Sequence, residues 1–111
     1  MKKLSAADII ETSDQQIIEV ECPEWGGSVS LRSLTAGEAM TFVDAFKDNK
    51  KDGPVRLLVM TAVNEEGKPL FTLDDLEKLK GKSLKVLMRL QKAAMEMNGL
   101  GDQGKTEAKN G

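Results

Sequence analysis

Histidine and tyrosine are absent from this 111-residue sequence, and its aromatic residues are one tryptophan and three phenylalanines. Histidine is the commonest general base and metal ligand in proteins, and it is the usual base of a nucleophilic triad. Carboxylates or lysines are the remaining groups that would have to carry any catalysis. We therefore expect a protein that is not an enzyme and that holds neither a metal nor another cofactor.

Cysteine and long apolar runs are also scarce. Cys22 is the single cysteine, so no internal disulfide forms, and this usage fits a reducing compartment. No segment approaches the ~20 apolar residues of a membrane span, and no signal-peptide apolar run follows the two N-terminal lysines. The net charge of −2 provides no basic footprint for nucleic acid. We expect a cytoplasmic protein that binds neither a membrane nor nucleic acid.

Two alternating segments around a glycine-rich turn predict a β-hairpin. Residues 15–22, QQIIEVEC, alternate apolar and polar side chains, and residues 28–34, SVSLRSL, repeat the alternation. Gly26 and Gly27 lie in the turn between them, where a tight reversal requires positive φ. Cys22 falls on the inward face of its strand, and we expect it to be a small buried hydrophobic residue.

Capping patterns and apolar spacing predict the helices. Ser5 with Asp8, and Thr35 with Glu38, are spaced as capping boxes. Periodicity does not distinguish strand from helix in the apolar run 54–63, but its length and the leading proline favour a helix. Two more helices are predicted, one after Thr72 and one from Ser83 to Asn98. The helix after Thr35 carries an apolar stripe of the core-facing kind, formed by Ala36, Ala39, Met40, Val43 and Phe46.

The last predicted helix is too apolar for a simple surface helix. Its charged residues occupy one narrow side, and its apolar arc is about twice the ~100° of an ordinary core-facing stripe. Either the helix is the centre of the domain, or part of its surface meets another chain. Methionine adapts to differently shaped partners, although a single methionine more often fills a core. Leu84, Met88 and Met95 share one edge, which we predict to be a partner-binding edge.

Trp25, in the hairpin turn, also has two interpretations. The indole either folds back to close one end of the core or stays exposed as an anchor for a partner, since tryptophan is enriched at binding hot spots. The chain has few other aromatic residues, which favours packing. Trp25 is retained as a candidate partner-binding residue.

Recognisable ligand-binding motifs are not found. The stretch NEEGKPLFTLDD has acids and a glycine, as a calcium loop does, but Gly67 in the sixth place puts Ala62 first and Leu73 twelfth. Neither side chain supplies the carboxylate oxygens that the ion requires. Asp74 and Asp75 are better explained as acids that complement a helix N-terminus.

The run EVECPEWGGSVSLRSLTAGE resembles the amino-terminal signature of tail assembly chaperones from long-tailed bacteriophages and prophages. In that family a short helix precedes a hairpin with a P-E-W-G-G turn. An R-x-L-T-x-x-E segment then opens a helix, and here its residues are Arg32, Leu34, Thr35 and Glu38. The NEEGKPLFTLDDLEKL block, the helix ending in MNGLG and the polar tail ending in EAKNG extend the resemblance, in order, over nearly the whole chain.

The resemblance implies a non-catalytic chaperone that acts in the cytoplasm of the bacterial host. Such proteins bind the tape measure protein, help tail tube subunits polymerise around it, and are absent from the mature virion. In many phages a programmed frameshift near the end of this gene adds a domain that contacts the tail tube protein. Self-association through the wide apolar helix face is a further expectation. The alternative is a structural or adaptor subunit that is retained in the phage tail.

The predicted fold is a single small α+β domain over residues 1–99, with one β-hairpin packed on about four helices. Residues 100–111 are polar and lack apolar periodicity, so we expect a disordered C-terminal tail there.

Overall fold

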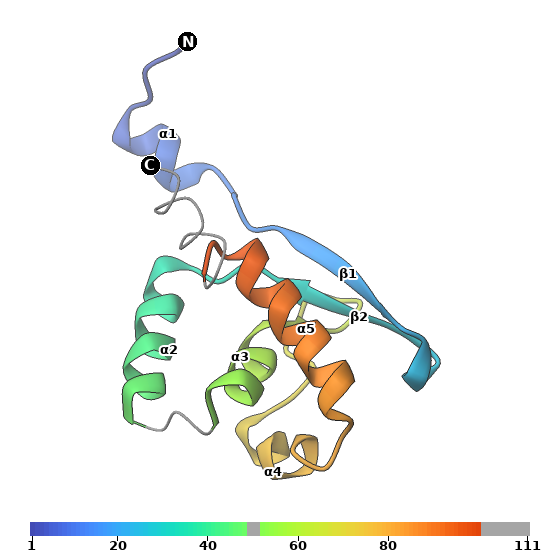
Figure 1. Cartoon of the computed structure of the whole chain (residues 1–111). Coiled ribbons are helices and arrows are strands. Elements are labelled where there is room, and N and C mark those ends of the chain that lie inside the picture. Colours follow the sequence, from blue (N-terminus) through green and yellow to red (C-terminus); the bar gives the residue numbers. More distant parts are fainter. Residues whose placement is uncertain (49–51, 101–111) are drawn as a thin grey trace, which may run out of the picture.

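The structure, a computed structural model, describes residues 1–48 and 52–100 and forms a small α+β domain, as the sequence predicted (Figure 1). The predicted C-terminal tail lies outside the described residues, except for Leu100. The elements in chain order are α1 (Ala6–Glu11), β1 (Ile17–Cys22), the short 3-10 helix η1 (Pro23–Trp25), β2 (Gly27–Arg32), α2 (Ala36–Asp48), α3 (Gly53–Thr61), β3 (Ala62–Val63), the 3-10 helix η3 (Leu73–Asp75), α4 (Leu76–Leu79) and α5 (Leu84–Met97).

The predicted hairpin is confirmed and belongs to a three-stranded antiparallel sheet of order β1-β2-β3. Its register runs from the pair Ile17–Arg32 to the pair Cys22–Gly27. The third strand was not expected, because residues 54–63 were predicted to be helical throughout. The helix ends at Thr61, and the chain turns to extended backbone at Ala62 and pairs with β2. A pairing of two residues is too short to leave a strand signature in the sequence.

The core lies where α5 and α3 meet the inner face of the sheet. In Figure 1, α5 lies in front of β2 and alongside β1, with α3 beside it. Five large side chains of this core are almost completely buried, namely Leu31, Leu57, Leu58, Val86 and Leu90. Cys22 is also fully buried, as expected for the inward face of β1. The sheet and the two helices therefore share a single apolar cluster.

Helix α2 is rotated relative to its predicted orientation. Phe42, outside the predicted stripe, is buried, whereas Met40 and Val43 are 68% and 41% exposed. The prediction of that stripe is wrong for these two residues and for Ala36, which is also exposed, and the side chain of Phe46 lies outside the described part. A phenylalanine buries more apolar area than valine or methionine, which favours the rotation that turns Phe42 inward.

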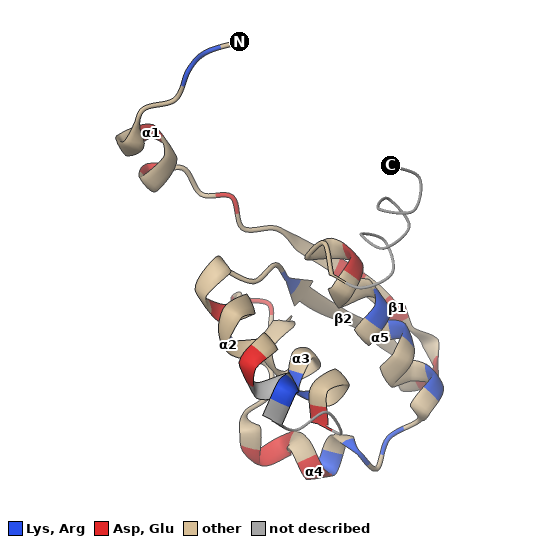
Figure 2. Ribbon diagram, turned by 60° about the vertical axis from the view of Figure 1, so that its left-hand side comes forward, with Lys and Arg blue, Asp and Glu red and all other residues tan. Residues whose placement is uncertain are grey.

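Helix α1 forms where the capping box predicted it but does not join the core. The Asp8 amide donates to Ser5 Oγ at 3.1 Å, and the Ser5 amide donates to Asp8 Oδ2 at 3.0 Å. No residue of α1 is buried. In Figures 1 and 2 the helix stands apart from the body, at the end of an extended segment that continues the line of β1.

The position of α5 in the core gives a first prediction. Replacing Leu90, which is fully buried, with alanine leaves a cavity and lowers the free energy of unfolding by about 2–5 kcal/mol. Leu84→Ala on the same helix is the matched control. Leu84 is 71% exposed, so we expect a change within about 0.5 kcal/mol. Urea denaturation followed by circular dichroism measures both, and equal losses would contradict this placement of α5.

Candidate functional site

The predicted partner edge of α5 is divided between solvent and core. Leu84 and Met88, one helical turn apart, are 71% and 55% exposed, while Met95 is half-buried and packs against the core cluster. The core side of the helix carries Val86, Leu90 and Ala94 instead. The helix is therefore central to the domain and also presents an apolar pair to solvent. Its role in binding a partner stays a prediction.

The hairpin turn is held against the first half of α5 by a bidentate ion pair. Arg89 Nη1 donates to Glu24 Oε1 at 2.8 Å, and Nη2 donates to Oε2 at 2.7 Å. These hydrogen bonds lower the pKa of Glu24 to about 2, well below its ordinary value. Gly26 follows with φ of 79°, a left-handed conformation that explains the glycine in the turn. Glu24 in the P-E-W-G-G turn thus connects two elements.

Trp25 directly follows Glu24, so it lies on the turn that the ion pair fastens to the first half of α5. Its side chain is 38% exposed and lies outside the core cluster. The expectation that the indole closes the core is therefore wrong. The ion pair ties the turn to α5. The indole remains partly in solvent, so Trp25 stays a candidate partner-binding residue.

A second ion pair organises the segment that leads into α2. Arg32 donates to both carboxylate oxygens of Glu38, at 2.8 and 2.7 Å. Glu38 also accepts from the Thr35 amide at 3.0 Å, and the Glu38 amide donates to Thr35 Oγ1 at 3.1 Å, which completes the predicted capping box. The pKa of Glu38 is lowered to about 2, first by the hydrogen bond from Arg32 and then by that from Thr35. These motif residues hold the strand-to-helix corner.

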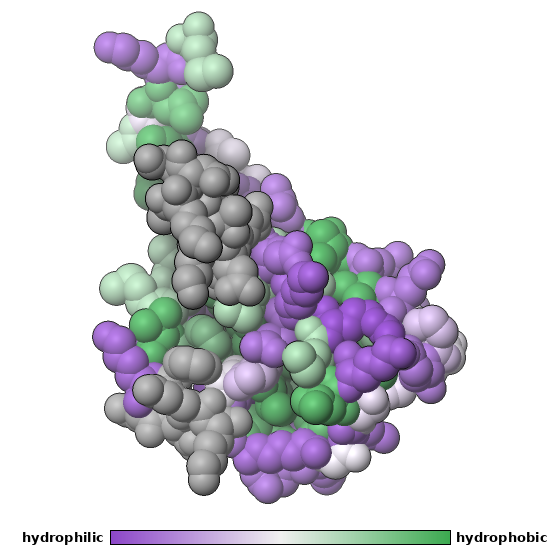
Figure 3. All heavy atoms as spheres, viewed as in Figure 1, coloured by the Kyte–Doolittle hydropathy of each residue, from purple (hydrophilic) through white to green (hydrophobic). Residues whose placement is uncertain are grey.

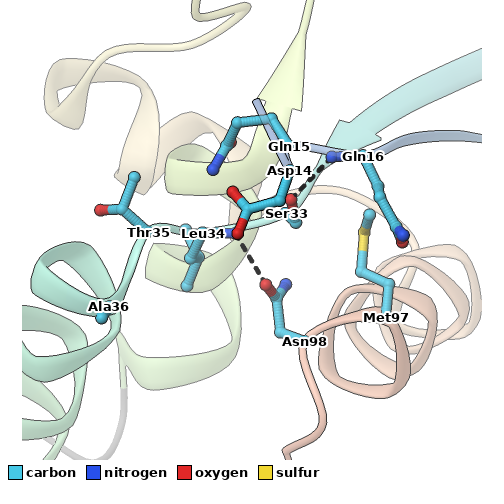
Figure 4. A pocket seen from close by; sticks show the side chains of 9 residues that line it. All are labelled: Asp14, Gln15, Gln16, Ser33, Leu34, Thr35, Ala36, Met97 and Asn98. Carbon is cyan, nitrogen blue, oxygen red and sulfur yellow. Dashed lines mark hydrogen bonds between the residues drawn. The ribbon is translucent and has the colours of Figure 1, made fainter. Parts of the chain in front are cut away.

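A polar pocket lies where this corner meets the C-terminal end of α5 (Figure 4). Asn98 Oδ1 accepts from the Leu34 amide at 2.7 Å, while its Nδ2 donates to the Ala94 carbonyl at 2.8 Å. The Gln16 amide donates to Ser33 Oγ at 2.9 Å. The polar groups that face one another in Figure 4 thus connect the segment before β1, the segment before α2 and the end of α5. The pocket therefore has a structural role.

An apolar groove that the sequence did not reveal runs between β1 and α5. It has a volume of about 590 Å³. Its floor is made by Ile18 and Val20 of β1 and by Ala93 and Met97 of α5, all partly buried. Charged side chains form its rim, namely Arg89, Lys92 and Glu96. We call this feature the β1–α5 groove. The alternation of apolar and polar residues in β1 predicts which side chains point inward. It does not show that α5 leaves two of these side chains partly uncovered, so the groove was not predicted.

The described part of the chain contains no metal-binding cluster and no membrane-spanning helix. Within residues 1–48 and 52–100, no three or more side chains of the metal-binding types gather around one point. The acid-rich turn after β3 is closed by Asn64, whose Oδ1 accepts from the amides of Glu66 and Lys68 at 2.8 and 3.1 Å. None of the helices in these ranges has the length and hydropathy needed to cross a bilayer.

Comparison with known proteins identifies a shared fold. No protein-family model and no curated protein sequence matches this chain. Among solved structures, the bacteriophage HK97 tail assembly chaperone superimposes with a TM-score of 0.61 and 23% sequence identity. The match covers 78% of this chain and 84% of the HK97 chain. The resemblance to tail assembly chaperones is thereby confirmed at the level of the fold.

The Arg32–Glu38 pair makes stability depend on pH. The folded-state pKa of Glu38, about 2, lies below its ordinary 4.5, so its contribution is complete above the unfolded-state pKa and is lost as pH falls toward 2. At neutral pH, Glu38→Gln is expected to lower the free energy of unfolding by about 1 kcal/mol, because the pair remains partly exposed. The difference in free energy of unfolding between Glu38→Gln and wild type becomes smaller as the pH falls, because wild type loses the contribution of the ion pair.

Urea midpoints at several pH values measure this effect. Glu66→Gln is the matched control, since it removes an exposed glutamate outside the pair. The role given to this ion pair would be contradicted by one result. In that result, Glu38→Gln is less stable than wild type by the same free energy of unfolding at neutral pH and below the ordinary carboxyl pKa.

Proposed function

We propose that this chain is a phage tail assembly chaperone that binds the tape measure protein and assists tail tube polymerisation without catalysis. The observation that carries the proposal is the fold shared with the HK97 tail assembly chaperone over 78% of this chain. The resemblance of the P-E-W-G-G turn and the R-x-L-T-x-x-E segment to the same family supports it independently of backbone geometry.

The proposed binding surface for the tape measure protein, here called the client surface, consists of Leu84 and Met88 of α5 and Trp25 of the hairpin turn. Leu84 and Met88 lie one turn apart on a rigid helix, and Trp25 is on the turn that Glu24 fastens to Arg89. Apolar side chains in this arrangement accept the apolar face of a client helix, and methionine adapts to clients of varying shape. Met95 adds a half-buried continuation of the same edge.

The size and surroundings of this surface favour reversible binding. The exposed apolar residues are few, and charged side chains such as Lys85 and Arg89 border them. Binding by a few anchors with a polar margin gives modest affinity, which suits a factor that must release its client. In this proposal the chaperone covers apolar faces of the tape measure protein until tube subunits replace it.

The cellular setting belongs to the same proposal. The protein acts in the cytoplasm of the bacterial host and is absent from the mature virion. A frameshift-extended form, if the gene encodes one, supplies the contact with the tail tube protein. The polar C-terminal segment provides the junction between the two parts in that form.

Co-expression with the tape measure protein of the same phage tests the client surface. Wild type is expected to raise the soluble fraction of that protein, and the double variant Leu84→Gln, Met88→Gln is expected to lose most of this effect. Both positions are exposed, so the fold should persist. The matched control is Met40→Gln, Val43→Gln, which changes an exposed apolar pair on α2.

Solubility is read by separating soluble from pelleted tape measure protein, with circular dichroism confirming that each variant is folded. The control pair should retain the activity of wild type. If wild type does not solubilise the tape measure protein, the proposed function is overturned. If both double variants act like wild type, the assignment of the client surface to α5 is overturned.

Mass spectrometry of finished virions distinguishes the proposal from a structural or adaptor subunit. A chaperone leaves before maturation, so its peptides should be missing from purified particles while those of tail tube protein are abundant. Recovery of this chain at the stoichiometry of a tail component would contradict the proposal and identify a retained subunit.

A further inference from the structure

Exposed lysines border the client surface. Lys85 lies three residues before Met88 in α5, and Lys92 lies four residues after it. Residues three or four positions apart are neighbours on a helix, so both lysines flank Met88. Both are exposed, and no ion pair joins either of them to another residue of the ranges 1–48 and 52–100. Figure 2 shows basic residues along α5 and in the loop that leads into it.

The charge of one of these lysines reaches the hairpin turn as well. Arg89, four residues after Lys85, holds Glu24 in the bidentate ion pair. The pKa of Glu24 is lowered first by the hydrogen bond from Arg89 and further by the positive charge of Lys85. Trp25 follows Glu24 in the turn. Lys85 is therefore close to both parts of the client surface, the apolar pair on α5 and the turn that carries Trp25.

The start of α5 adds positive charge that the helix does not offset. Ser83 precedes the helix without a side-chain capping hydrogen bond, and the first turn contains no acidic residue. Unpaired amides at a helix N-terminus carry partial positive charge, which acidic side chains normally complement. The charged residues at this end of α5 are instead Lys82 and Lys85. Departures of this kind from local rules are expected at functional sites.

Apolar and basic side chains together define the shape and charge of a matching partner. Leu84 and Met88 are exposed one helical turn apart, and Figure 3 shows hydrophobic and strongly hydrophilic residues side by side over α5. A partner helix with apolar residues at the same spacing and acidic residues beside them satisfies both features. A helix with lysines or arginines in those places would bring like charges together, which disfavours binding. Nucleic acid would match the lysines but not the exposed apolar pair.

We propose that the client surface selects amphipathic helical segments whose apolar stripe is flanked by aspartate or glutamate. This inference rests on the proposed function, because it specifies which parts of a client the chaperone binds. Lys82, Lys85 and Lys92 attract the acidic margin of the segment and discriminate against basic segments, while Leu84 and Met88 cover its apolar stripe. Exposed charges act mainly on the rate of encounter, so the selection depends on ionic strength.

Two synthetic peptides of about 18 residues, long enough to form a helix, test the selection on the full chain. Both carry the same leucine stripe, and the residues beside it are glutamates in one peptide and lysines in the other. At low salt the acidic peptide is expected to bind about three- to ten-fold more tightly, as two exposed ion pairs would provide. The preference should shrink between about 0.01 M and about 0.15 M salt, because the Debye length falls from about 30 Å to about 8 Å.

Fluorescence anisotropy of labelled peptides measures the dissociation constants. Trp25 is the single tryptophan of the chain, so a change in its emission with peptides that lack tryptophan and tyrosine places binding near the hairpin turn. The double variant Lys85→Gln, Lys92→Gln is expected to lose most of the preference for the acidic peptide. Lys47→Gln, Lys68→Gln is the matched control and should keep it, since it removes the same charge at exposed positions of α2 and of the turn after β3.

Several results would overturn the inference. Equal binding of the two peptides by wild type, or no binding of either, would do so, whereas solubility of the co-expressed tape measure protein decides the proposed function separately. Equal loss of preference in both double variants would attribute it to net charge instead of the client surface. Tighter binding of a DNA duplex than of the acidic peptide would assign the lysines to nucleic acid. Trp25 emission that changes on dilution of wild type, but not of Leu84→Gln, Met88→Gln, would show that a second copy covers the surface.

Discussion

Packing of α5 across the sheet and against α3 is the contact on which the rest of this structure depends. Val86, Leu90 and Ala94 give that helix one fully buried side. Because the domain has a single core, the orientation of α5 also decides which of its residues remain outside. Leu84 and Met88 face solvent because the opposite side of α5 is buried. The orientation of α5 about its own axis therefore determines both the stability of the core and the position of the proposed client surface.

Polar contacts hold the elements around this helix in place. Glu24 ties the hairpin turn to Arg89, and Asn98 ties the end of α5 to the segment before α2. The residues that gave the sequence its resemblance to tail assembly chaperones are thus largely structural. Their contacts support the surface on which Leu84, Met88 and Trp25 are displayed. The proposed function requires rigid support more than reactive groups, since the proposed work is contact alone.

Local signals account for what the sequence predicted well. Alternation identified the hairpin, and the Ser5 and Thr35 capping boxes identified two helix starts. The errors involve contacts between distant segments. β3 is defined by two pairs with β2. The rotation of α2 depends on which neighbour covers Phe42, and the turn that carries Trp25 is positioned by an ion pair between Glu24 and Arg89 of α5. The β1–α5 groove has the same origin, because it exists only in the space between two elements.

Methyl NMR on the full chain tests the central claim most directly, because one methionine lies on the exposed edge of α5 and another packs against the core from α3. Met88 is 55% exposed on that edge, whereas Met60 on α3 is partly buried and packs against the core. On addition of an apolar helical segment of the tape measure protein, the account predicts that the Met88 methyl signal shifts and that the Met60 signal does not. No shift at Met88 under saturating client, or a shift at Met60 with Met88 unchanged, would contradict it.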